Sequence, residues 1–301
     1  MTVSDTTADA AQRKRATLIG TVAILLWASL ALFTTATPSI PALQLTAMTF
    51  TLSFAATLVL WLIRGEGVLR HLKLPVKAWA LGIYGLFGYH ALYFLALKLA
   101  PPLEASLINY LWPLLIVLFS ALLPGERLRW FHLAGAGLGL VGTIVLITGK
   151  GEVGFDPRFA LGYAAAFTCA FTWSSYSVLS RRFAAVPTDA VGGFCGATAL
   201  LSWILHFATE TTAWPNDPVE WIAVAALGLG PVGLAFFCWD HGMKRGDIRA
   251  LGSMAYAAPL LSTLLLILFG PGVLTVPVAA ACTLIIGGAL LGTGDLRGKR
   301  G

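Results

Sequence analysis

The chain carries an internal repeat, and this repeat constrains its fold more than any other sequence feature. Matched Trp, Lys, Tyr and Pro residues are all separated by 146 positions: Trp27 and Trp173, Lys98 and Lys244, Tyr110 and Tyr256, Pro113 and Pro259. Such matches arise by chance much less often than matches of Leu or Ala in an apolar chain. The spacing therefore predicts that the back half of the chain is a second copy of a unit formed by the front half.

Composition indicates that this unit lies in a membrane. The chain is 57% hydrophobic and 11% charged, with a mean hydropathy of +0.81, which is too apolar for a soluble domain. Apolar stretches of about 20 residues are long enough to cross a bilayer as helices. They are found at roughly 18–37, 43–63, 78–97, 103–123, 131–149, 159–180, 190–208, 220–239, 250–270 and 277–294. Because strands of a membrane barrel would alternate in polarity, the predicted fold class is all-α integral membrane, with ten transmembrane helices.

Basic residues gather on one side of the predicted membrane. With the N-terminus placed in the cytoplasm, 17 of the 20 Lys and Arg residues fall in inner loops or at the termini. The outer side holds only Lys98, Lys150 and Arg158. This asymmetry follows the positive-inside rule and predicts that both termini are cytoplasmic. The net charge of +6 is thus a topology signal, and we expect no nucleic-acid partner.

An odd number of helices in each half means that the two copies enter the membrane from opposite sides. Lys98 falls in an outer loop, whereas its counterpart Lys244 falls in an inner one. The predicted organisation is a disordered cytoplasmic N-terminus (1–17), a five-helix repeat (18–149), an outer linker (150–158), a second five-helix repeat (159–294) and a cytoplasmic tail (295–301). Inverted repeats are the geometry behind alternating access in secondary transporters. Duplication that only builds a larger bundle is the alternative.

Ionisable residues inside membrane spans are costly and therefore point to functional sites. His90 lies near the middle of the third span, and Tyr93, three residues on, shares its helix face. A His facing a watery cavity would bind a solute or respond to protons. A His satisfied by a backbone carbonyl of a neighbouring helix is the alternative. No acidic residue lies in the central region, because Asp240 and Glu104 fall near span ends.

The fourth and ninth spans each carry a mid-span proline, Pro113 and Pro259. Proline removes an N–H and clashes with the carbonyl four residues earlier, so it bends or breaks a helix. Matched irregular helices in two repeats point to the binding site of a transporter, and we expect these prolines to mark gating bends. Tyr110 and Tyr256 precede them by almost one turn, where a bend would aim both rings inward.

Aromatic and polar side chains complete the predicted cavity. Trp27 and Trp173 lie near the middle of their spans, where an indole N–H needs a partner. The predicted substrate-binding residues are His90, Tyr93, Asn109, Tyr110, Trp112, Trp173, Tyr176 and Tyr256. An apolar cavity with aromatic walls and few polar groups suits a small amphiphilic organic solute.

The sequence offers no convincing cofactor or metal site. Four Cys residues lie in or beside apolar spans without a CxxC spacing and read as small buried hydrophobes. A GxGxxG match at 137–142 lies inside an apolar span with no βαβ context. Asp240, His241, Lys244 and Asp247 are interpreted as a solvated inner loop. The pairs Gly135 and Gly139, and Gly288 and Gly292, predict close helix contacts within the chain or between copies.

The chain resembles the drug/metabolite transporter superfamily in its EamA-type ten-helix form. The similarity rests on the helix count, the inverted repeat, a Trp in the first helix of each half and the turn Leu123-Pro-Gly-Glu126. Residues 89–93 (Tyr-His-Ala-Leu-Tyr) and 109–113 (Asn-Tyr-Leu-Trp-Pro) further resemble the YddG-type aromatic amino-acid exporters. The second half departs from the family pattern at 269–272, where Phe-Gly-Pro-Gly lacks the Glu.

These features together predict a secondary transporter of the bacterial inner membrane and not an enzyme. The expected partners are membrane lipid and a small solute, with aromatic amino acids favoured by resemblance, exported by a monomer through alternating access. An exporter of another metabolite or drug of the same superfamily is the closest alternative. A membrane enzyme acting on lipid or isoprenoid would need carboxylates, a metal or a nucleophile at the interface, and the chain offers only scattered loop acids.

Overall fold

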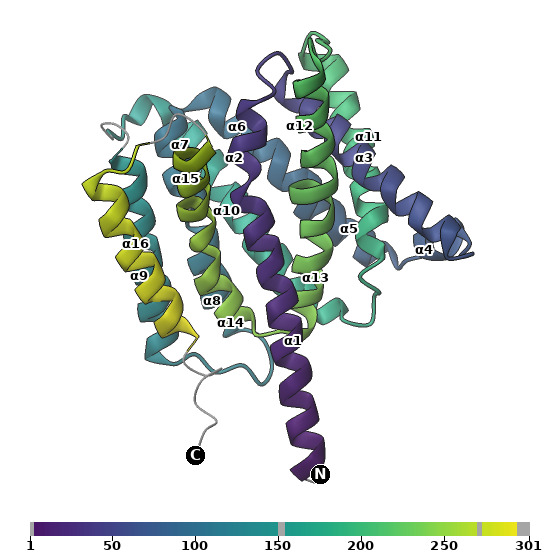
Figure 1. Ribbon diagram of the computed structural model, residues 1–301. Helices are drawn as coiled ribbons and strands as arrows, with labels where there is room; N and C mark the ends of the chain where they lie inside the picture. The colour runs from purple at the N-terminus through teal and green to yellow at the C-terminus, as the bar shows by residue number, and fades with distance from the viewer. Residues whose placement is uncertain (1–2, 150–153, 270–272, 294–301) are drawn as a thin grey trace.

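The computed structural model describes residues 3–149, 154–269 and 273–293, and over these residues the regular structure is entirely helical. Helices run side by side through one bundle, and α1 (Val3–Ala28) begins at the same end of the bundle at which α16 (Val276–Gly292) finishes (Figure 1). Eight helical segments are long and apolar enough to cross a membrane. The fold class is therefore all-α membrane protein.

The front half contains four long segments after α1, several of them broken. In chain order its elements are α2 (Leu30–Thr35), α3 (Ala42–Ile63), α4 (Val68–Leu72), α5 (Val76–Ile83), the π-helix η1 (Tyr84–Gly88), α6 (Tyr89–Leu99), α7 (Pro102–Asn109), α8 (Trp112–Ser120) and α9 (Trp130–Thr148). The segments α5–η1–α6 and α7–α8 each run on as one apolar span, 76–99 and 102–120.

The back half follows the same order. Its elements are η2 (Pro157–Phe159), α10 (Ala160–Ser180), η3 (Arg181–Phe183), α11 (Ala190–Thr209), α12 (Pro218–Leu229), the π-helix η4 (Gly230–Leu234), α13 (Ala235–Arg245), α14 (Ile248–Ala255), α15 (Ala257–Phe269) and α16. Gly230 and Pro231, which lie within the eighth predicted span, open the π-helix η4.

Several elements recur at the repeat spacing. The π-helices η1 and η4, the helices α6 and α13, and the helices α7 and α14 have identical lengths and are each offset by 146 residues. The long segments are also interrupted at the same place, since α7 ends at Asn109 and α14 ends at Ala255. Helix resumes just before Pro113 and Pro259, so each missing N–H falls in a first turn, where it needs no intrahelical partner.

Glycines bring α9 and α16 into backbone contact. A Cβ added at Gly135 would lie 2.6 Å from the Gly288 carbonyl oxygen and from the Gly292 nitrogen, and one at Gly288 would lie 2.6 Å from the Gly135 oxygen. The small residues predicted to allow close packing therefore act within one chain. This pair flanks the bundle at the side away from α11 and α12 (Figure 1).

The N-terminal segment 1–17, predicted to be disordered, is helical over residues 3–17, because α1 extends well beyond the apolar stretch. Arg13 and Thr17 explain the extension: Arg13 bonds Asp247 at 3.1 Å, and the Thr17 hydroxyl accepts the Asp247 N–H at 2.8 Å. The tail 295–301, part of the linker (150–153) and the Gly-Pro-Gly at 270–272 lie outside the described residues.

Candidate solute cavity

A cavity of about 670 Å³ opens among the helices of both halves. Its walls come from α1, α2, α3, α6, α7, α8, α10, α12, η4, α13 and α15. It runs from Trp112 and Trp173 in the middle of the bundle to Thr37, Lys98 and Glu210, where helices end. We call this end of the bundle the cavity end. The size and the mainly apolar lining suit a small organic solute.

Six of the eight predicted binding residues line this cavity. They are His90, Tyr93, Asn109, Tyr110, Trp112 and Trp173. The rings of His90, Tyr93 and Trp173 are linked through Tyr89, whose ring centroid lies 5.3, 6.2 and 5.4 Å from theirs. Two predicted residues, Tyr176 and Tyr256, lie outside the cavity.

Tyr256 was predicted to face inward but is fully buried in a different environment. Its hydroxyl accepts the backbone N–H of Leu114 at 3.1 Å. That N–H belongs to the first turn of α8, where the break at Tyr110 and Leu111 leaves it without an intrahelical acceptor. The ring also fills the space over Gly139, where an added Cβ would lie 2.4 Å from it. Tyr256 therefore stabilises the broken helix of the other half.

Tyr176 lies behind the cavity wall. Its ring packs on Trp173 at 5.3 Å and on the bare backbone of Gly85, where an added Cβ would lie 2.2 Å from the ring. The residue is 4% exposed and faces α5 and α11. It supports Trp173 from the side opposite the solute space. Tyr176 is three residues after Trp173 and only partly offset from it around α10, and its ring turns toward α5 and α11 and not toward the cavity.

His90 follows the π-helix η1 and points its ring at the cavity wall. Its Nδ1 lies 2.7 Å from the Leu86 carbonyl oxygen, one turn earlier in the same helix. A carbonyl only accepts, so Nδ1 donates and Nε2 is the ring nitrogen left for another partner. Phe50 packs edge-on against the ring at 5.1 Å. His90 thus lines the cavity, and the carbonyl that satisfies one of its nitrogens belongs to its own helical segment and not to a neighbouring helix.

Sequence reasoning missed several lining residues. Trp27 lines the cavity and donates its indole N–H to the Pro231 carbonyl oxygen of η4 at 3.1 Å. Phe50, Tyr89 and Phe236 also line it. The repeat spacing was a usable signal, because Phe236 stands 146 residues after His90.

Asn109 carries a free acceptor into the cavity wall. Its amide nitrogen donates to the Tyr89 hydroxyl at 3.1 Å. Its Oδ1 is buried and has no hydrogen-bond partner among the described residues. A buried acceptor without a donor is costly, so this oxygen is suited to receive a hydrogen bond from a solute.

Charged side chains are rare in the lining. Among the described residues only Lys98 and Glu210 carry permanent charge there. Glu210 is already bound: its two oxygens accept the N–H groups of Leu43 and Gln44 at 3.1 and 3.2 Å, and His206 lies 3.0 Å away. No ion pair or hydrogen bond of Lys98 is found within the described part of the chain.

Ion pairs between side chains hold the opposite end of the bundle together, and we call it the basic end. Glu126 lies 3.4 Å from Arg13, 3.7 Å from Arg181 and 3.2 Å from Arg249. Asp247 bonds Arg13 at 3.1 Å and Arg249 at 3.5 Å. Burial raises the pKa of Asp247, but Arg13 and Arg249 outweigh this and hold it below its usual value. This cluster joins α1, the loop before α9, the end of α10 and the start of α14.

Asp240, Lys244 and Asp247 are buried, which corrects their interpretation as a solvated loop. Asp240 and Lys244 form an ion pair of 2.9 Å, one turn apart on α13. Lys244 also donates to the Val186 carbonyl oxygen at 2.9 Å, and Thr188 donates to Asp240 at 2.8 Å. The sequence misled because the α13 helix continues past the apolar stretch that ends near residue 239.

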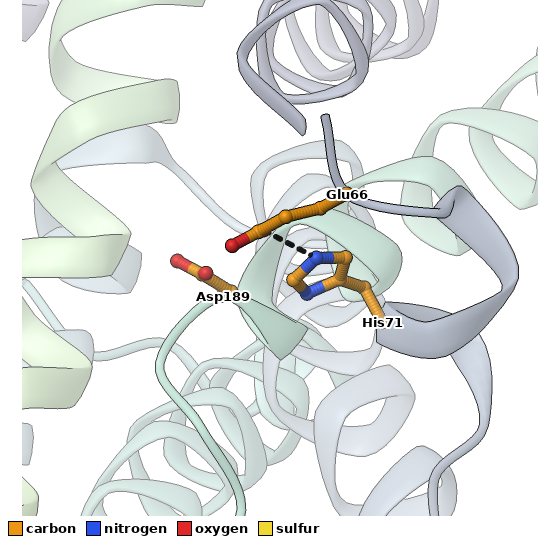
Figure 2. Close-up of side chains that lie close together, drawn as sticks. All are labelled: Glu66, His71 and Asp189. Carbon is orange, nitrogen blue, oxygen red and sulfur yellow. Dashed lines mark hydrogen bonds and ion pairs between the residues drawn. The ribbon is translucent and has the colours of Figure 1, made fainter. Parts of the chain in front are cut away.

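One group of side chains at the edge of the molecule has metal-ligand types. Glu66, His71 and Asp189 place one ligand atom each within 4.8 Å of the others (Figure 2). His71 Nε2 lies 2.8 Å from Glu66, and Arg64 lies 3.4 Å from Asp189. The His71 ring stacks on the buried Trp61 at 4.4 Å. Each ligand thus already has a protein partner, and the group ties α3 and α4 to the start of α11.

A multi-pass helical bundle with a solute-sized cavity between two similar halves defines a membrane transporter, as opposed to a soluble binding protein. The chain belongs to the EamA-like transporter family, whose sequence profile matches it twice, at residues 14–148 and 160–293. The two matches begin 146 residues apart, at the repeat spacing. The chain is a multi-pass protein of the bacterial inner membrane.

Relatives cover nearly the whole chain. A protein of Ancylobacter novellus named "Aromatic amino acid exporter YddG" is 57% identical over 282 residues, which span 93% of this chain and 98% of the relative. A protein of the same name from Escherichia coli is 26% identical over 290 residues, or 93% and 97% of the two chains. A solved crystal structure superposes with a TM-score of 0.88 and 56% identity, covering 93% of this chain and 99% of that one.

Proposed function

We propose that this protein exports aromatic amino acids, or similar small amphiphilic metabolites, across the inner membrane by alternating access. The observation that carries the proposal is the cavity lined by Trp27, Trp112, Trp173, Tyr110 and His90 in a chain 57% identical to a named aromatic amino-acid exporter. Aromatic walls stack favourably on an aromatic side chain. The free Oδ1 of Asn109 is suited to accept a hydrogen bond from the ammonium of an amino acid.

The proposed architecture has ten transmembrane helices in two inverted five-helix repeats. α10 and α16 would add two crossings to the eight apolar segments. The matched π-helices, the matched breaks and the double profile match support the repeat. The basic loops support cytoplasmic termini; with that orientation the basic end would face the cytoplasm and the cavity would open outward. The structure would then represent the outward-open state of a monomer.

The breaks before Pro113 and Pro259 are the proposed hinges. An interrupted helix lacks some backbone hydrogen bonds at the break, so bending it there costs less free energy than bending a continuous helix. In the proposed cycle the basic end opens to admit a solute from the cytoplasm, and the cavity end opens to release it.

Uptake into liposomes tests the proposed function. Purified protein should carry labelled L-tryptophan and L-phenylalanine, and a panel of cationic drugs with and without a pH gradient measures range and coupling. Combined Tyr110→Ala and Trp173→Ala should abolish the flux. Trp130→Ala is the matched control, because Trp130 is 73% exposed and far from the lining. Flux of a drug or another metabolite, with none for aromatic amino acids, would favour another exporter of the superfamily.

A further inference from the structure

Lys98 and Lys244 occupy equivalent positions of the two halves but opposite environments. Each lies in the last turn of its helix, α6 or α13, and the two are 146 residues apart. Lys244 is 6% exposed and sits at the closed basic end. Lys98 is exposed at the mouth of the cavity. This is the difference expected between a closed and an open end in an inverted repeat.

The surroundings of Lys244 indicate where Lys98 would lie when the cavity end closes. Lys244 donates to the carbonyl oxygen of Val186, the residue before Pro187. The equivalent of Val186 is Ile40, which also precedes a proline and also lines the cavity. Exchange of the two conformations would therefore bring the Lys98 ammonium against the Ile40 carbonyl, out of contact with water.

The negative partner of Lys244 has no counterpart beside Lys98. Asp240 neutralises Lys244 at 2.9 Å and is held by Thr188. The equivalent positions are Phe94 and Ala42. Closing the cavity end would thus bury a lysine charge next to a carbonyl but without a carboxylate. A buried charge without a counter-ion is strongly unfavourable.

The nearest acid in the lining does not supply that carboxylate. Glu210 is the one carboxylate among the described lining residues, and both its oxygens accept backbone N–H groups at the start of α3. His206 lies against the same carboxylate. Withdrawing Glu210 would leave these N–H groups without their acceptor, so its charge is already committed.

We propose that Lys98 binds the carboxylate of the solute and that this ion pair lets the cavity end close over a bound solute. The inference rests on the proposed export of amino acids and extends it to a specificity rule: a transported solute must carry a carboxylate. An aromatic amine of the same shape would enter the cavity, but the cavity end would not close over it, because Lys98 would be buried without a partner.

The test compares L-tryptophan with tryptamine, which lacks only the carboxylate, in proteoliposome uptake. Wild-type protein should carry tryptophan and exclude tryptamine. Lys98→Met should raise the KM for tryptophan about tenfold or more, the value of one charge-assisted hydrogen bond, and remove the preference over tryptamine. Lys98→Arg should retain the preference. Lys77→Met, which removes an exposed lysine outside the cavity, is the matched control.

A second variant makes the opposite change. Phe94→Asp places a carboxylate one turn before Lys98, as Asp240 stands before Lys244. It should lower affinity for tryptophan and permit uptake of tryptamine. If Lys98→Met loses all uptake, equilibrium dialysis decides: retained tryptophan affinity overturns the inference, and selective loss of tryptophan binding relative to tryptamine supports it.

The outcomes separate this inference from the proposed function. If the wild type takes up tryptophan, and Lys98→Met does so with the same KM and the same preference over tryptamine, the role of Lys98 is overturned. The proposed function would then still stand. Absence of any aromatic amino-acid uptake by the wild type would overturn the proposed function and this inference with it.

Discussion

The two ends of the bundle are built from equivalent segments but are held in different ways. At the basic end three Arg and two acidic side chains bridge four elements. The equivalents of Glu126, Asp247 and Arg249 are Gly272, Pro101 and Leu103, so the sequence cannot form a second such cluster at the cavity end. The two ends thus share a similar backbone arrangement, but different side-chain interactions hold them. The asymmetry favours the conformation in which the basic end is closed.

The largest loss of stability at the basic end is expected when the carboxylate beside Lys244 is removed. Asp240→Asn leaves a 3% exposed ammonium with only neutral partners. We expect a loss of about 3–5 kcal/mol in the free energy of unfolding, as for other broken buried pairs, measured by chemical denaturation in detergent. Asp189→Asn is the control, since the half-exposed pair of Asp189 with Arg64 should contribute about 0–1 kcal/mol. Equal losses in the two variants would show that burial of the Lys244 pair is unimportant.

Glu126→Gln should open the basic end. Glu126 contacts three Arg residues, but Arg13 is 38% exposed, so the contribution is smaller than for a fully buried pair. We expect a shift of about 2 kcal/mol toward the other conformation, roughly 30-fold in population. Spin labels at the ends of α1 and α14 would measure the change in separation. Asp156→Asn, which removes a half-exposed acid at the other end of the bundle, should leave the separation unchanged.

The matched tyrosines should separate stability from binding. Tyr256→Phe removes the acceptor of the Leu114 N–H and should lower the free energy of unfolding by about 1 kcal/mol or slightly more, with little change in solute affinity. Tyr110→Phe, at the equivalent position but in the cavity lining, should change the KM and spare stability. Thermal unfolding and uptake kinetics on both variants check this, and identical effects would contradict the division of roles.

Of these changes to the basic end, mild acidification should have the smallest effect. The pKa of Asp247 is depressed, so its contribution is complete above the unfolded value of about 3.9 and is lost only as pH falls through the lower folded value. Between pH 5 and pH 8 hydrogen exchange at the start of α14 should not depend on Asp247, once corrected for intrinsic rates. Faster corrected exchange at pH 5, absent in Asp247→Asn, would count against a depressed pKa.

Sequence alone predicted the all-helical membrane class. The offset of 146 placed the breaks correctly, because proline acts on its own helix whatever packs around it. It could not show that Tyr256 turns away from Tyr110. That difference depends on the N–H of Leu114, which the helix break leaves unpaired and which meets the Tyr256 hydroxyl only once α8 packs against the other half.

Charged residues were the least predictable. Asp240 and Lys244 follow an apolar stretch and looked like a loop, yet the helix carries them into the core as a pair. In the sequence Glu126 is only part of a turn. Its ion pairs are with three Arg side chains that are distant in sequence. Hydropathy records the preference of each residue for water, whereas ion pairs between segments are set by tertiary packing.

Thiol labelling would show directly whether the cavity is the solute site and whether it opens away from the basic end. With the four native Cys residues replaced by Ala, Ala31→Cys in the lining is treated in intact cells with a membrane-impermeant reagent. We expect labelling from outside and protection by L-tryptophan, whereas Leu122→Cys, 71% exposed near the basic end, should stay unlabelled until the membrane is opened. Labelling of Ala31→Cys only from the cytoplasm, or without protection by tryptophan, would contradict this expectation.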